Sequence, residues 1–179
     1  MVSSRPRASR LVSLIAPMVG LLASQATAAL DWQSCPPKLT CGPQIEELVA
    51  KGVERSESFR TLVLIVGFHP GVEVAVQTRR LNTATHAHSS LQVRGIVVEV
   101  SGRAIRQVSH VSGSVSVRQF AYARDQIGDI AHELAHVVQL LEGVQPEDLD
   151  SRGCWAVNYR IKVVAELREY ERLTRGLEP

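Results

Sequence analysis

The chain has 179 residues, with 20 lysines and arginines against 18 aspartates and glutamates and a formal net charge of +2. This near-neutral balance, together with the lack of any recognised nucleic-acid-binding motif, argues against a nucleic-acid partner. The length suits a single domain with one hydrophobic core.

The N-terminal segment has the pattern of an export signal. Three arginines precede an apolar run over residues 11–23, and Ala26-Thr27-Ala28 follows as an A-x-A cleavage sequence. We therefore predict a signal peptide over residues 1–28 and one mature domain over residues 29–179, exported to the periplasm or the extracellular space. An uncleaved anchor is the alternative, but Pro17 interrupts the run, which is also short for a membrane span. Without its three arginines the mature chain keeps 17 of the 20 basic residues, against 18 acids.

The cysteines agree with export. Cys35 and Cys41 lie in a proline-containing segment, residues 31–43, that we predict to be irregular. In an oxidising compartment these two are the pair expected to close a small-loop disulfide. Cys154 would then be left over, either buried or bound to a metal.

The first half of the mature chain changes from helical to extended periodicity. Apolar residues at helical spacing predict a helix over residues 44–51, which Gly52 is expected to weaken or end. Ser56 or Ser58 can cap a second helix through residues 59–66. Alternating polarity and β-branched residues then predict strands over 72–77, 91–100, 104–111 and 114–117. Between them we expect a polar loop over 78–90 and a hairpin turn at Ser101-Gly102, and Gly95 predicts a bulge in the second strand.

From about Ala121 the apolar spacing becomes helical again. The stripe comprises Ile127, Ile130, Leu134, Val137, Val138 and Leu141. A connection containing Pro146 leads to a last long helix, which Asp150 or Ser151 can cap. Together the elements predict an α+β domain in which a small, mostly antiparallel sheet packs on helices.

The periodic helix carries His132-Glu133-Leu134-Ala135-His136, an H-E-x-x-H motif. Residues four apart lie one turn above each other, so both imidazoles can reach one metal ion, for which zinc is the usual choice. Glu133 can then act as general base on a metal-bound water. Such a motif also occurs by accident, but here it lies in a strongly periodic helix, has apolar flanks and follows a β-rich stretch.

A catalytic zinc site normally has three protein ligands and one open position for water. No histidine follows His136, which excludes the longer metzincin pattern. If the last helix runs antiparallel to the motif helix, residues 153–160 lie level with the two histidines, and this window contains Cys154 but no acid. Asp150 is the first candidate for the third ligand, although it is also a natural helix cap. Cys154 is the second candidate, although a cysteine is also often a small buried hydrophobe. Glu166 lies roughly 15 Å further along and is expected to be an ordinary polar helix residue.

Other polar residues have simpler interpretations. His86 and His88 form an H-x-H pair in a segment expected to be a solvated loop. The remaining candidates are expected to be structural: His69, His110, and the two tyrosines that could otherwise donate to an oxyanion, Tyr122 and Tyr159.

At the H-E-x-x-H motif the chain resembles the zincin class of zinc metallopeptidases. It is also similar to a group of small exported bacterial proteins, at Ser58-Phe59-Arg60-Thr61-Leu62-Val63, at the motif helix and at Leu149-Asp150-Ser151. The resemblance implies a zincin-like fold, His132 and His136 as metal ligands, Glu133 as the base and Asp150 as the third ligand. Leu-Asp-Ser departs from the group, which has an aromatic residue, an acid and a threonine there.

We therefore predict an exported zinc-dependent hydrolase, a metallopeptidase that binds one Zn²⁺ per chain and cleaves a peptide or protein substrate. An edge strand within residues 91–100 could align an extended peptide by strand addition. Two alternatives remain open: a catalytically weak or inactive metal-binding protein of the cell envelope, and a structural interaction domain with an accidental motif. After signal cleavage no membrane span is expected.

Overall fold

The computed structural model describes residues 35–81, 87–100, 103–119, 121–149 and 154–175, and for residues 96–100, 103–107 and Cys154 it describes the backbone alone. All of these residues belong to one compact unit, Trp32–Pro179. The predicted signal peptide and the predicted Ser101-Gly102 turn lie outside the described residues. Within the described part of the chain, no helix is long and apolar enough to cross a membrane.

The described strands form one mixed sheet. They are β1 (Leu39–Cys41), β2 (Val72–Arg79), β3 (Ala87–Val100) and β4 (Arg103–Arg118), in the order β1-β2-β4-β3. β2 runs parallel to both β1 and β4, and the β3–β4 pair is antiparallel. The α+β class is confirmed, but the prediction of a mostly antiparallel sheet is wrong. Two helices carry the chain back between β1 and β2, and β3 takes the outer edge, so β4 returns beside β2 in the same direction.

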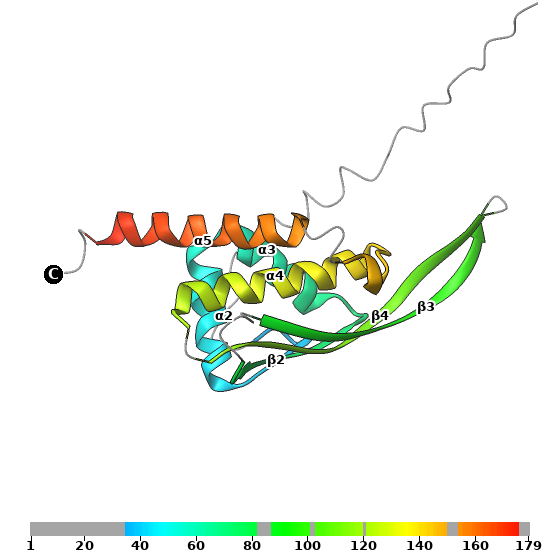
Figure 1. Cartoon of the computed structure of the whole chain (residues 1–179), viewed down its shortest axis with the longest axis horizontal. Coiled ribbons are helices and arrows are strands. Elements are labelled where there is room, and N and C mark those ends of the chain that lie inside the picture. Colours follow the sequence, from blue (N-terminus) through cyan, green and yellow to red (C-terminus); the bar gives the residue numbers. More distant parts are fainter. Residues whose placement is uncertain (1–34, 82–86, 101–102, 120, 150–153, 176–179) are drawn as a thin grey trace, which may run out of the picture. The chain divides into compact units, whose positions relative to one another are not determined.

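The helices lie together on one side of the sheet (Figure 1). They are α2 (Pro43–Arg55), α3 (Glu57–Phe68), α4 (Ala123–Leu141) and α5 (Cys154–Thr174), with a short 3-10 turn, Pro146–Asp148, before α5. α2, α3 and α4 contact the strands, and α5 packs on α4. The core lies between these helices and the inward face of β2 and β4, where alternate valines such as Val74 and Val115 are buried.

Local sequence signals explain the first two helices. Ser56 caps α3 as predicted, since its hydroxyl accepts a hydrogen bond of 3.1 Å from the Phe59 N–H. Gly52 does not end α2 but lies within it. A Cβ at Gly52 would lie 2.6 Å from Cδ1 of Phe59, so this glycine serves the close packing of α2 on α3.

The strands differ from the predictions in three places. β1 lies in the segment predicted to be irregular, and β3 starts at Ala87, inside the predicted loop. The segments predicted as separate strands, 104–111 and 114–117, form the single strand β4, which passes through Gly113 at a φ of 147°. The predicted bulge is confirmed by a register shift between Arg94 and Gly95, and the predicted Cys35–Cys41 disulfide is present.

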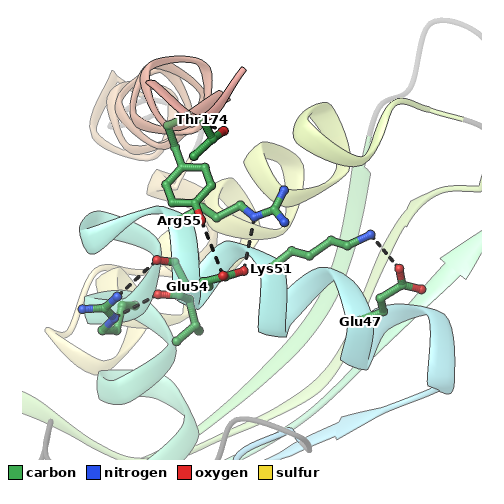
Figure 2. A network of polar contacts seen from close by, with 8 residues as sticks. Glu47, Lys51, Glu54, Arg55 and Thr174 are labelled. Atoms are coloured by element: carbon green, nitrogen blue, oxygen red, sulfur yellow. Dashed lines mark hydrogen bonds and ion pairs between the residues drawn. The ribbon is translucent and has the colours of Figure 1, made fainter. Parts of the chain in front are cut away.

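Polar contacts with α2 hold the C-terminal end of α5 (Figure 2). The guanidinium of Arg55 lies 5.2 Å from the centre of the Tyr170 ring, and the Tyr170 hydroxyl donates to Glu54 at 3.5 Å. The backbone oxygen of Tyr170 in turn accepts a hydrogen bond from Thr174. These contacts tie the last turns of α5 to the α2 surface.

Glu166 of α5 acts as a second cap for α3. Its carboxylate accepts hydrogen bonds from the Ser56 hydroxyl at 2.7 Å, the Ser58 hydroxyl at 2.6 Å and the Ser58 N–H at 3.0 Å. A carboxylate at a helix N-terminus is favourable because it satisfies free N–H groups and the helix dipole. Glu166 therefore has a structural role at α3, which removes it from the candidate metal ligands.

We expect Glu166→Gln to lower the free energy of unfolding by about 1 kcal/mol at neutral pH, the usual effect of losing a helix cap. Burial raises the pKa of Glu166, but hydrogen bonds from Ser56 and Ser58 outweigh it and hold the pKa below 4.5. The stabilisation is therefore complete above pH 4.5 and is lost as the pH falls through the folded-state pKa. Urea unfolding across this range should show the parent–variant difference shrinking at low pH.

Glu169→Gln on the same helix is the matched control. Glu169 forms an exposed ion pair with Arg172, so its removal should leave the unfolding midpoint within error. A Glu166→Gln difference that stayed constant with pH would contradict the capping role of the carboxylate.

Candidate metal centre

Helix α4 brings the two motif histidines together. The Nε2 atoms of His132 and His136 lie 3.1 Å apart, and the ring planes meet at 88°. Two nitrogen ligands at about 2.0–2.1 Å from a tetrahedral zinc lie roughly 3.3 Å from each other. The two Nε2 atoms thus have the separation expected of two ligands to one zinc ion.

Burial of α4 holds these side chains in place. Ile130, Leu134 and Val137 are fully buried and anchor the helix in the core. Glu133 and His136 are 5% and 6% exposed, and His132 is partly buried. The apolar stripe therefore packs α4 into the core, and the motif side chains lie where α4 borders a pocket.

The surroundings of His132 favour its neutral form. Burial lowers the pKa of His132 below 6.5; His136 and Arg160 also lower it, whereas Glu133 and the backbone of Ala156 oppose the change. Its Nδ1 atom is buried and meets no partner at hydrogen-bond distance among the described residues. A neutral imidazole is the form that binds a metal.

His136 has a defined partner on its own helix. Its Nδ1 lies 2.9 Å from Oε1 of Gln139, one turn further along α4. Both side chains are buried. The sequence did not single out Gln139, although its spacing of three residues from His136 is visible there.

Helix α5 runs antiparallel to α4, as predicted. Arg160 pairs with the buried Asp129 at 2.7 Å, and Arg124 pairs with Glu171 at 2.8 Å. In this register Ala156 lies beside His132.

The motif lines a pocket of about 370 Å³. Its lining residues are Ala87, His88, Ser89, His132, Glu133, His136, Pro146 and Leu149. The pocket therefore lies between α4, the first residues of the edge strand β3 and the turn that precedes α5. Leu149 is the residue directly before Asp150, so the chain reaches the pocket immediately before the predicted third ligand.

His88 contributes to this pocket from the strand, but its side chain is poorly placed as a ligand. It pairs with Ser116, whereas Ala87 and Ser89 pair with core-facing valines of β4. Because side chains alternate along a strand, the His88 imidazole points to the face opposite α4, in agreement with its exposure. His88 lies in β3 and not in the predicted loop, and His86 is outside the described residues.

Among the remaining candidates whose side chains the structure describes, none joins the two histidines. Asp150 and the side chain of Cys154 lie outside the described residues, and Glu166 caps α3. Tyr159 packs on Trp155 with ring centres 4.6 Å apart, and Tyr122 is exposed. Two others are structural: His69 accepts from the Gly71 N–H in the turn before β2, and His110 lies beside Glu73 on the sheet. In the described part of the chain no three ligating side chains converge.

Comparison of the chain with protein-family models, with curated proteins and with solved structures finds no match. The functional interpretation therefore depends on the geometry of the pocket and of α4.

Proposed function

We propose that the protein is an exported, zinc-dependent hydrolase of zincin-like fold, most simply a metallopeptidase. The observation that carries the proposal is the 3.1 Å approach of the His132 and His136 Nε2 atoms in a pocket that Glu133 also lines. The donor set fits zinc, which accepts imidazole nitrogen together with a carboxylate oxygen. His132 and His136 would hold the ion, with Asp150 as the proposed third ligand.

The proposed zinc and Glu133 would have different roles in hydrolysis. A bound zinc would supply Lewis-acid activation of water and of a substrate carbonyl. Glu133 would accept a proton from the attacking water and return it to the leaving amine nitrogen. Its position one residue after His132 keeps the carboxylate at the same pocket as the ligands.

The edge strand supports a peptide as the substrate. β3 is the last strand of the sheet, and its outer edge has no partner strand among the described residues. Ala87, His88 and Ser89 line the pocket, so an extended peptide paired with this stretch would pass the motif. The stretch of β3 that borders the pocket begins at residue 87, ahead of the predicted region over 91–100.

We also propose a signal peptide over residues 1–28 and a periplasmic or extracellular location.

A second candidate is a metal-binding envelope protein with little or no catalytic activity. This candidate needs only the His132–His136 pair to hold the ion. Zinc binding is common to both candidates, so the metal is tested first and hydrolysis second.

We expect the purified mature chain to contain about one zinc ion, measured by elemental analysis after extensive dialysis. His132→Ala should reduce zinc to background because the pair of Nε2 ligands is broken. His110→Ala is the matched control, since this histidine lies on the sheet beside Glu73, and its zinc content should equal that of the parent. A parent chain free of zinc would overturn both candidates and leave the structural interaction domain.

A further inference from the structure

Gln139 is a buried polar residue of α4 that contacts the histidine pair. Its side chain is 4% exposed, and its Oε1 lies 2.9 Å from Nδ1 of His136. The backbone oxygen of Gln139 also accepts a hydrogen bond of 3.0 Å from the Val144 N–H in the turn after α4. Both the backbone and the side chain of Gln139 therefore make hydrogen-bond contacts.

This contact favours one position of the proton on the His136 ring. A carbonyl oxygen only accepts hydrogen bonds, so the contact is a hydrogen bond when Nδ1 carries the proton. A neutral imidazole has one N–H, and the lone pair is then on Nε2. Nε2 is the atom that faces His132 at 3.1 Å, at the position proposed for zinc.

We propose that Gln139 is a positioning residue that keeps His136 in the Nδ1–H tautomer and thereby directs the Nε2 lone pair toward the metal position. The metal part of the inference rests on the proposed function, whereas the tautomer is a property of the zinc-free protein. An amide suits this role because it accepts the Nδ1–H bond without adding a second buried negative charge beside Glu133.

The chain offers a matched control on the same helix. Gln126 is also buried, at 7% exposure, and its amide donates to the backbone oxygen of Arg118 at 2.8 Å. Replacing either glutamine by methionine removes a buried amide of α4 while keeping a side chain of similar length. Of these two glutamines, Gln139 alone contacts a motif histidine.

The tautomer is tested by nitrogen-15 NMR of the imidazole rings in the zinc-free mature protein. We expect the parent and Gln126→Met to show His136 as the Nδ1–H form, and Gln139→Met to show a shift toward the Nε2–H form. A parent His136 in the Nε2–H form would overturn the proposal, as would a Gln139→Met spectrum identical to that of the parent.

The second measurement is zinc affinity, by competition with a chromophoric chelator. We expect Gln139→Met to bind zinc about 10–100-fold more weakly, as for other outer contacts of metal-binding histidines, and Gln126→Met to match the parent. Gln139→Glu, which keeps the acceptor, should restore most of the affinity. Equal affinity of Gln139→Met and the parent would overturn the metal part. If the parent binds no zinc, the proposed function fails, and the NMR result decides the tautomer independently.

Discussion

Replacing Glu133 by glutamine is expected to reduce peptide hydrolysis by about 10²–10⁴-fold while zinc content stays unchanged. Glutamine keeps the shape of the side chain but cannot accept the proton of the attacking water. Glu133 is nearly buried and lines the pocket with both histidines, so the substitution changes the base without removing a proposed ligand. Cleavage would be measured on a broad peptide library, with zinc content determined on the same samples.

Glu142→Gln is the control for this experiment. Glu142 is an exposed residue at the C-terminal end of α4, away from the pocket lining, and its replacement should leave the cleavage rate unchanged. A Glu133→Gln variant as active as the parent would contradict general-base catalysis by this residue. A zinc-containing parent that cleaves no peptide would favour the inactive metal-binding protein.

Replacing Asp150 by alanine is expected to weaken zinc binding by at least about 100-fold, since loss of a direct ligand should exceed the 10–100-fold effect of outer contacts. One observation supports Asp150: Leu149, the residue before it, lines the pocket. A carboxylate there would complete the three-ligand set of a catalytic zinc site. Affinity would be measured by chelator competition.

Two further variants make the third-ligand experiment decisive. Glu147→Ala removes an exposed acid from the same connection and should leave zinc affinity unchanged. Cys154→Ser tests the second candidate for the ligand. Full affinity in Asp150→Ala combined with a large loss in Cys154→Ser would assign the ligand to the cysteine and contradict the role proposed for Asp150.

Local patterns predicted the helical half of the site well. The apolar stripe around Leu134 predicted α4, and Ser56 predicted the start of α3, because both signals depend on residues within one or two turns. The same patterns located β2, β3 and β4 but predicted neither β1 nor the strand order. β1 has three residues and little periodicity of its own, and the parallel pairing of β2 with β4 joins Val72 to Val111, a relation that no local pattern encodes.

The sequence by itself determined the motif and its helix, since both follow from spacing along the chain. It indicated the Cys35–Cys41 disulfide and the antiparallel direction of α5, which the structure confirmed. Only the tertiary structure decided what surrounds the motif. It assigned Glu166 to the α3 N-terminus, turned the His88 side chain away from α4, and brought Gln139 to His136. The positions of these side chains depend on the strand order and on which helix faces pack together. Both depend on contacts between residues that are distant in the sequence.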